Sequence, residues 1–151
     1  MNEQIKISKG TSYTVLHTGD PSSWKNLYSK FGSFAEPVRG KYFLKSNLDM
    51  KGLEISINSF PAGKSMPFIH RHHKNEELYI VLGGGATFYI DGKFEELTPG
   101  SFIRMAPQAA RSFKAHDSGP LLMMVIQFPH DSEVVDDVKD GSRVPGPVEW
   151  P

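Results

Sequence analysis

The stretch PFIHRHHKNEELYIVLGGG (residues 67–85) holds three of the six histidines of the chain, followed by two adjacent glutamates. His70 and His72 are two positions apart in a β-type run, so their side chains leave the same face of a strand. The turn former Asn75 then allows the chain to reverse, which would place Glu77 on the adjacent antiparallel strand and facing the same point. Two imidazoles and a carboxylate form a ligand set for a divalent transition metal, and iron, manganese, nickel and zinc are all compatible with it.

A second interpretation of the same residues is a solvated surface turn, in which the histidines and glutamates are ordinary polar side chains. His73 is expected to point outward, and Glu76 has the opposite strand parity to Glu77 and is expected to face solvent. Spacing alone leaves both interpretations open.

Outward from this stretch the chain continues as short β-type runs that are separated by turn residues. In LEISINSF (53–60), apolar and polar residues alternate, which is typical of a strand with one buried face. Asp91 and Gly92 join two strand-like runs, and this pair strongly favours a two-residue hairpin. Runs spaced in this way predict an antiparallel sandwich or barrel rather than alternating strands and helices.

The two ends of the chain differ from this pattern. Asp20 can cap a helix and Pro21 suits a first helical position, so we expect a short helix near 21–30 that ends by Gly32. SYTVL (12–16) predicts an additional strand. From residue 129 onward the composition shifts to proline, glycine and acidic residues, which predicts an extended tail.

Composition narrows the classes of function. The 151 residues are enough for one domain with a single core. The 17 basic and 17 acidic residues balance, which argues against nucleic acid or an anionic membrane as a partner. The chain has no cysteine, so any metal must be bound by nitrogen and oxygen. Without a long apolar segment or an apolar N-terminal run, we expect a cytoplasmic protein.

The segment GKSMPFIHRHHKNEELYIVLGG (63–84) resembles the first signature motif of the cupin superfamily. That motif has a glycine, a His-x-His pair, a glutamate and a second glycine, which here are Gly63, His70, His72, Glu77 and Gly84. The resemblance implies an all-β fold, the double-stranded β-helix of the cupin or jelly-roll β-barrel, with a metal site inside it. It also implies three parts: an N-terminal arm with the short helix (1–39), the barrel (40–130) and an extended C-terminal tail (131–151).

The segment GSFIRMAPQAARSFKA (100–115) resembles the second cupin motif in a degraded form. The motif calls for Pro-x-Gly, a histidine as fourth metal ligand and a final asparagine. Here Ala106 stands for the proline, Gln108 for the glycine, Arg111 for the histidine and Ala115 for the asparagine. A guanidinium keeps its protons and cannot coordinate a cation.

Three arrangements of Arg111 satisfy this constraint. It turns away and leaves a site with three ligands and water; it orients an anionic substrate that also touches the metal; or it pairs with Glu77 and replaces the metal. Tyr79 shares the parity of Glu77 and is a candidate acid or base, with a buried, hydrogen-bonded tyrosine as the alternative. Gln127 is the one polar residue of LLMMVIQF (121–128), so it either reaches the cavity or sits at a strand end.

Two classes of function follow. In the first, His70, His72 and Glu77 hold a metal of an enzyme that acts on a small anionic or polyoxygenated molecule as an oxygenase, isomerase, decarboxylase or lyase. Arg111 and Tyr79 are then the candidate catalytic residues. In the second, the barrel is a non-catalytic small-molecule-binding module with a vestigial metal site. Either protein is expected to be a homodimer, because a small barrel has strand edges that a second copy can cover.

Overall fold

The computed structural model describes residues 2, 4–30 and 35–131. It is built mainly of β-strands with two short helices. In chain order the elements are β1 (Lys6–Lys9), β2 (Thr14–His17), the 3-10 helix η1 (Pro21–Asn26), β3 (Tyr28–Ser29), β4 (Val38–Arg39), β5 (Lys41–Phe43), α1 (Lys45–Leu48), β6 (Glu54–Phe60), β7 (Asn75–Gly83), β8 (Ala86–Ile90), β9 (Lys93–Leu97), β10 (Phe102–Met105), β11 (Arg111–Ala115) and β12 (Leu121–Pro129). Neither described helix is long and apolar enough to cross a membrane.

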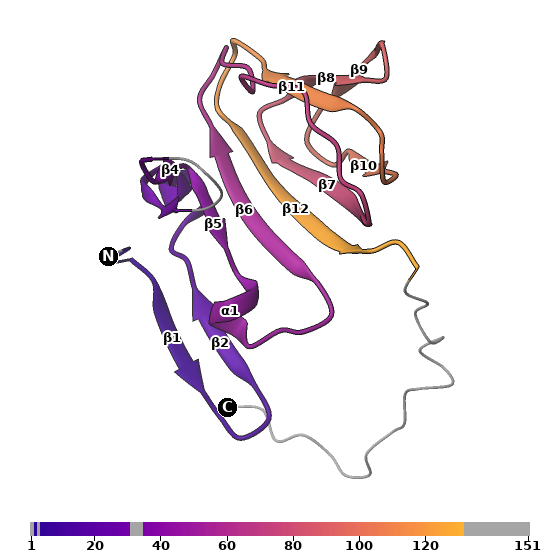
Figure 1. Ribbon diagram of the computed structural model, residues 1–151. Helices are drawn as coiled ribbons and strands as arrows, with labels where there is room; N and C mark the ends of the chain where they lie inside the picture. Colours follow the sequence, from indigo (N-terminus) through magenta and orange to yellow (C-terminus); the bar gives the residue numbers. More distant parts are fainter. Residues whose placement is uncertain (1, 3, 31–34, 132–151) are drawn as a thin grey trace, which may run out of the picture.

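Two antiparallel sheets form the body of the molecule (Figure 1). A five-stranded sheet has the order β10-β7-β12-β6-β5, and a three-stranded sheet has the order β11-β8-β9. Every strand pair in both sheets is antiparallel. The expected all-β architecture is therefore present.

The core lies between the sheets and follows the period of two expected for strands with one buried face. In β7 the residues Glu77, Tyr79 and Val81 are buried, while Leu78 and Ile80 between them are partly exposed. Aromatic rings fill the middle of the core, where Phe88 stacks on Phe113 at 5.3 Å between ring centroids. The inward face of β7 thus begins at Glu77 and continues into apolar packing.

Two turns set the registers of these strands. Asp91 and Gly92 both have positive φ, and the hairpin pairs Ile90 with Lys93, as the sequence predicts. Gly84, between β7 and β8, has φ of +69°, and a Cβ there would lie 2.2 Å from the carbonyl oxygen of Pro120. Only glycine allows both the left-handed backbone and this close approach.

The N-terminal region differs from the prediction in extent. The helix is a 3-10 helix that ends at Asn26, shorter than the expected 21–30; Asp20 caps it by accepting a hydrogen bond from Ser22 N at 2.9 Å. The expected strand at 12–16 is β2, which pairs with β1 of the same chain. Gly32 and the expected tail, from residue 132 onward, lie outside the described residues.

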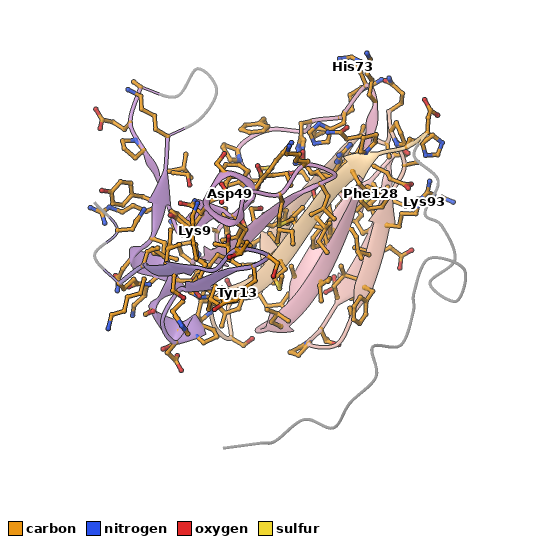
Figure 2. The ribbon with its side chains drawn as sticks, turned by 90° about the horizontal axis from the view of Figure 1, so that it is seen from below. Lys9, Tyr13, Asp49, His73, Lys93 and Phe128 are labelled. Carbon is orange, nitrogen blue, oxygen red and sulfur yellow. The ribbon has the colours of Figure 1, made fainter. Side chains whose placement is uncertain are left out.

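The β1–β2 hairpin lies beside α1, a helix that the sequence did not predict (Figures 1 and 2). Lys9 of β1 forms an ion pair at 2.5 Å with Asp49, the residue that ends α1. Both side chains are more than half exposed, so this pair contributes little stability. A small apolar cluster of buried residues consists of Trp24, Leu27, Leu44 and Ile57.

Candidate metal centre

The strand pairing brings the three candidate ligands together from two different sheets. Glu77 lies near the start of β7 in the five-stranded sheet. His70 forms an isolated antiparallel bridge with Arg111 of β11, with reciprocal backbone hydrogen bonds of 2.9 and 3.0 Å. The prediction that Glu77 lies on the strand adjacent to His70 is therefore wrong. Residues 71–74 cross from one sheet to the other, and the side chains meet across the interior of the barrel.

His70, His72 and Glu77 each offer one ligand atom, and these atoms lie within 4.8 Å of one another. The two imidazole rings are 5.6 Å apart between centroids, and His72 Nε2 lies 3.0 Å from Glu77 Oε1. The three side chains therefore form a group that can hold a metal ion. Its neighbours His73, exposed at the outer end of the molecule (Figure 2), and Glu76 are not part of it.

Glu76 is also less open to solvent than its strand parity predicts. Its side chain is only 13% exposed; it forms an ion pair with Arg104 of β10, and its Oε2 lies 3.4 Å from His130 Nδ1. These bonds to Arg104 and His130 lower the pKa of Glu76 against the opposing effect of burial. Glu76 therefore points away from the ligand group, as its strand parity predicts, but its side chain is largely covered and does not face open solvent.

Glu77 is the most heavily hydrogen-bonded side chain of the group. Its Oε2 accepts from Tyr79 Oη at 2.6 Å, and its Oε1 accepts from Gln127 Nε2 at 2.7 Å and contacts His72. Gln127 was expected either to reach the cavity or to sit at a strand end, and the structure shows that it reaches the cavity. Tyr79 is buried with its hydroxyl satisfied by the carboxylate, so its direct contact is with Glu77.

Arg111 pairs with Glu77 inside the barrel. Its Nη2 and Nε donate to Glu77 Oε2 at 2.6 and 3.1 Å, and its Nη1 donates to the carbonyl oxygen of Ala109 at 2.8 Å. Arg111 is 1% exposed and Glu77 is 2% exposed, so the pair is shielded from water. The structure thus has the ion pair of the third arrangement and excludes the first, in which Arg111 turns away from the site.

The charges of the site follow from these contacts. Burial acts to raise the pKa of Glu77, but hydrogen bonds from His72, Tyr79 and Arg111 outweigh it and lower the pKa to about 2. Burial, and then the charge of Arg111, lower the pKa of His70. Burial and the negative charge of Glu77 raise the pKa of Tyr79. At neutral pH, Glu77 is therefore ionised, His70 is neutral and Tyr79 keeps its proton.

These protonation states suit a metal, because ligands must be deprotonated carboxylates and neutral imidazoles. His70 Nδ1 is buried without a hydrogen-bond partner among the described residues. A buried nitrogen of this kind is expected to have a partner, which a bound metal ion or ligand would supply. Two ligand atoms bound at right angles to one ion lie about 3.0 Å apart, the separation of His72 Nε2 and Glu77 Oε1. Arg111 contacts only Oε2, which leaves Oε1 on the side of the histidines. The residues present therefore fit a divalent ion.

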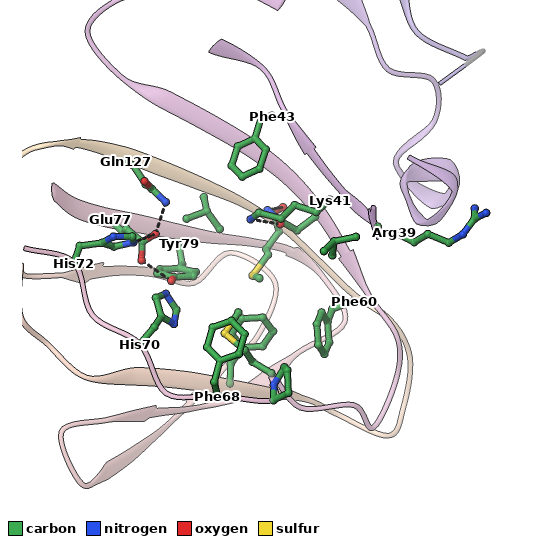
Figure 3. Close-up of a pocket in the computed structure, with 18 residues that line it drawn as sticks. Arg39, Lys41, Phe43, Phe60, Phe68, His70, His72, Glu77, Tyr79 and Gln127 are labelled. Carbon is green, nitrogen blue, oxygen red and sulfur yellow. Dashed lines mark hydrogen bonds and ion pairs between the residues drawn. The ribbon is translucent and has the colours of Figure 1, made fainter. Parts of the chain in front are cut away.

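A cavity of about 410 Å³ opens from this group (Figure 3). Its polar end is formed by His70, His72, Glu77 and Gln127. Most of the remaining wall is apolar and includes Phe43, Phe60, Met66, Phe68, Phe113, Met123 and Val125. Arg111 is not among the lining residues.

The cavity also contains a residue that the sequence reasoning missed, Lys41 of β5. Its Nζ donates to Asn58 Oδ1 at 3.0 Å and to Ser56 Oγ at 3.2 Å. One signal was available: Lys41 and Phe43 share strand parity, so a charge and an aromatic ring leave the same face of one strand.

Comparison with known proteins shows which family the chain belongs to. The model of the cupin domain family matches residues 57–127. A cupin protein from Bacteroides fragilis is 33% identical, and its crystal structure aligns with a TM-score of 0.67 over 78% of this chain and 98% of that one. This chain therefore belongs to the cupin family, as the motifs predicted.

A candidate sugar phosphate isomerase from Acidithiobacillus ferrooxidans is 25% identical, with a TM-score of 0.52 over 60% of this chain and 59% of that one. No curated protein matches the sequence.

Proposed function

We propose that this cupin binds a divalent transition metal through His70, His72 and Glu77 and is an enzyme that acts on a small molecule in the adjoining cavity. The observation that carries the proposal is the convergence of the three ligand atoms within 4.8 Å at one end of that cavity. Two histidines and an ionised carboxylate at this spacing have no evident use in a purely apolar binding pocket. A bound divalent ion would supply Lewis-acid polarisation of a substrate oxygen.

The protein's own residues would prepare the site for this chemistry. Arg111 donates a hydrogen bond to Glu77 Oε2 and so keeps the carboxyl group ionised. Gln127 donates to Oε1 and so holds this oxygen on the side of the histidines. Tyr79 donates to the same carboxylate, so we assign Tyr79 and Arg111 to the positioning of Glu77. The apolar walls exclude water and strengthen the electrostatic interactions within the cavity.

The charge of the substrate can be proposed more narrowly than the type of reaction. The candidate sugar phosphate isomerase from Acidithiobacillus ferrooxidans is named for an anionic substrate, and an anionic small molecule is one of the substrate classes expected for this chain. Isomerase, decarboxylase, oxygenase and lyase chemistry all need a polarised substrate oxygen or a bound dioxygen, and a fold does not choose among them.

A second function is favoured by the saturation of Glu77. This carboxylate already contacts four side chains, and an arginine stands where the family motif has its fourth ligand. In that alternative the Arg111–Glu77 pair takes the place of the metal, and the barrel is a non-catalytic module that binds a small molecule.

Metal analysis of protein purified without an affinity tag, followed by calorimetric titration with manganese, iron(II), nickel and zinc, separates the two functions. We expect wild type to bind one ion, His72→Ala to bind none and His73→Ala, a matched change at the exposed neighbour, to bind as wild type does. Absence of binding to wild type would assign the protein to the binding module. Metal-loaded protein would then be screened for isomerase, decarboxylase and oxygenase turnover.

A further inference from the structure

Lys41 is held in the cavity wall by the local backbone. It follows Gly40, whose φ is +72° and whose Cβ, if present, would lie 2.1 Å from the carbonyl oxygen of Ser59. Glycine therefore lets the start of β5 approach β6, and the Ser59 N–H donates to the carbonyl oxygen of Gly40 at 2.7 Å. This approach pairs Lys41 with Asn58 across the two strands.

Two neutral side chains accept hydrogen bonds from the ammonium of Lys41. Asn58 Oδ1 and Ser56 Oγ accept its hydrogen bonds, and Asn58 Nδ2 in turn donates to Ser56 O and Oγ at 3.1 Å. The Nζ atom also lies 4.9 Å from the centroid of the Phe43 ring. Asn58 and Ser56 are buried, so the head group of Lys41 is fixed within the cavity wall.

Among the charged residues that line the cavity, Lys41 supplies the positive charge that faces its interior. The charged lining residues are Arg39, Lys41 and Glu77. Arg111 offsets the charge of Glu77 at 2.6 Å, and Figure 3 shows Arg39 pointing away from the cavity. Figure 3 also shows Lys41 across the cavity from His72 and Glu77, with aromatic rings around the space between them. The cavity thus has a ligating end, an apolar middle and a cationic wall.

Burial makes this positive charge costly. It lowers the pKa of Lys41 to about 8, although the negative charges of Glu77 and Glu54 act in the opposite direction. An anion that enters the cavity would favour the protonated lysine and recover part of the desolvation cost.

From this geometry we propose that Lys41 binds the anionic end of a small ligand, a carboxylate or a similar oxyanion, whose apolar body lies along the aromatic wall. The ligand would be the substrate of the metal centre, and to that extent the inference rests on the proposed function. It also narrows the expected substrate, because the apolar lining fits an anion with an apolar body better than a polyoxygenated one.

Phenylacetate and its neutral counterpart phenylacetamide are suitable probes, because they differ only in the charge of one end. Their binding is measured by calorimetry on protein freed of metal with a chelator, so that a carboxylate cannot bind through an ion. Failure of the proposed metal site would then leave this test intact. The variants are Lys41→Met, which keeps the apolar stem, Lys41→Arg, which keeps the charge, and Lys51→Met, a matched change at an exposed lysine.

At about pH 7 we expect wild type, Lys41→Arg and Lys51→Met to prefer phenylacetate over phenylacetamide by about tenfold or more, and Lys41→Met to lose this preference. Between about pH 7 and pH 9.5, wild type should lose affinity for phenylacetate as Lys41 gives up its proton, whereas Lys41→Arg should not. Glu54, Glu77 and His70 are the other titratable groups coupled to Lys41, and all three remain in both proteins.

The preference of Lys41→Met for the charged probe decides whether the assignment of Lys41 holds. Loss of the preference in Lys41→Met alone, with thermal unfolding close to that of wild type, supports the assignment. A preference that survives in Lys41→Met, equal binding of the two probes by wild type, or binding of neither probe overturns it.

Discussion

Replacement of Arg111 by methionine tests the central electrostatic feature of the barrel. Arg111→Met keeps much of the apolar volume but leaves the buried carboxylate of Glu77 without its cationic partner. Breaking a buried pair in this way typically costs about 3–5 kcal/mol. Tyr79 and Gln127 still donate to Glu77, and His72 still contacts it, so we expect a loss near the lower end, about 3 kcal/mol. A domain of ordinary stability remains folded after such a loss.

The pKa of Glu77 yields a second value, for the hydrogen bonds from His72, Tyr79 and Arg111 and the charge of Arg111 taken together, less the cost of burial. A carboxyl group with a depressed folded pKa stabilises the fold above its unfolded pKa, and this stabilisation disappears as the pH falls towards the folded value. For Glu77 this window extends from 4.5 down to about 2. The difference corresponds to about 3 kcal/mol, so the stability advantage of wild type over Glu77→Gln should shrink by about that amount across the window.

Urea unfolding monitored by tryptophan fluorescence, to which the buried Trp24 contributes, measures these free energies. Arg104→Met is the matched control, because Arg104 pairs with Glu76 at the surface and its loss should cost less than about 1 kcal/mol. The double variant Arg111→Met/Glu77→Gln should be less destabilised than the sum of the two single variants. Equal losses for Arg111→Met and Arg104→Met, or strict additivity in the double variant, would refute this account.

Three further predictions concern the metal, a turn and the assembly. Arg111→His supplies a third imidazole as a fourth ligand and removes a positive charge, so calorimetry should show divalent-metal affinity raised by about tenfold or more; unchanged affinity would contradict it. Gly84→Ala should cost more than about 2 kcal/mol in urea unfolding, since its Cβ would meet the carbonyl oxygen of Pro120, whereas Gly92→Ala, with positive φ but open space, should cost about 1 kcal/mol. We also propose that the protein is a homodimer, which a monomer mass in light scattering at micromolar concentration would disprove.

Some features were predictable because they depend on residues close together in the chain. The Asp91–Gly92 hairpin, the capping of η1 by Asp20 and the inward parity of Glu77 and Tyr79 follow from local backbone preferences and the period of a strand. The motif around His70 and the β-rich pattern likewise indicated the cupin fold, which the family comparison confirms.

Other features appear only when distant strands are brought into register. Nothing within reach of Glu77 in the chain specifies that Arg111, 34 residues later, and Gln127, 50 residues later, donate to its two oxygens. The same holds for the sheet that His70 joins and for the entry of Lys41 into the cavity. The sequence by itself determined which residue types the site contains and which face of each strand they occupy. Closure of the two sheets decided which of them touch, because a contact across a barrel depends on strand order and register that no local preference encodes.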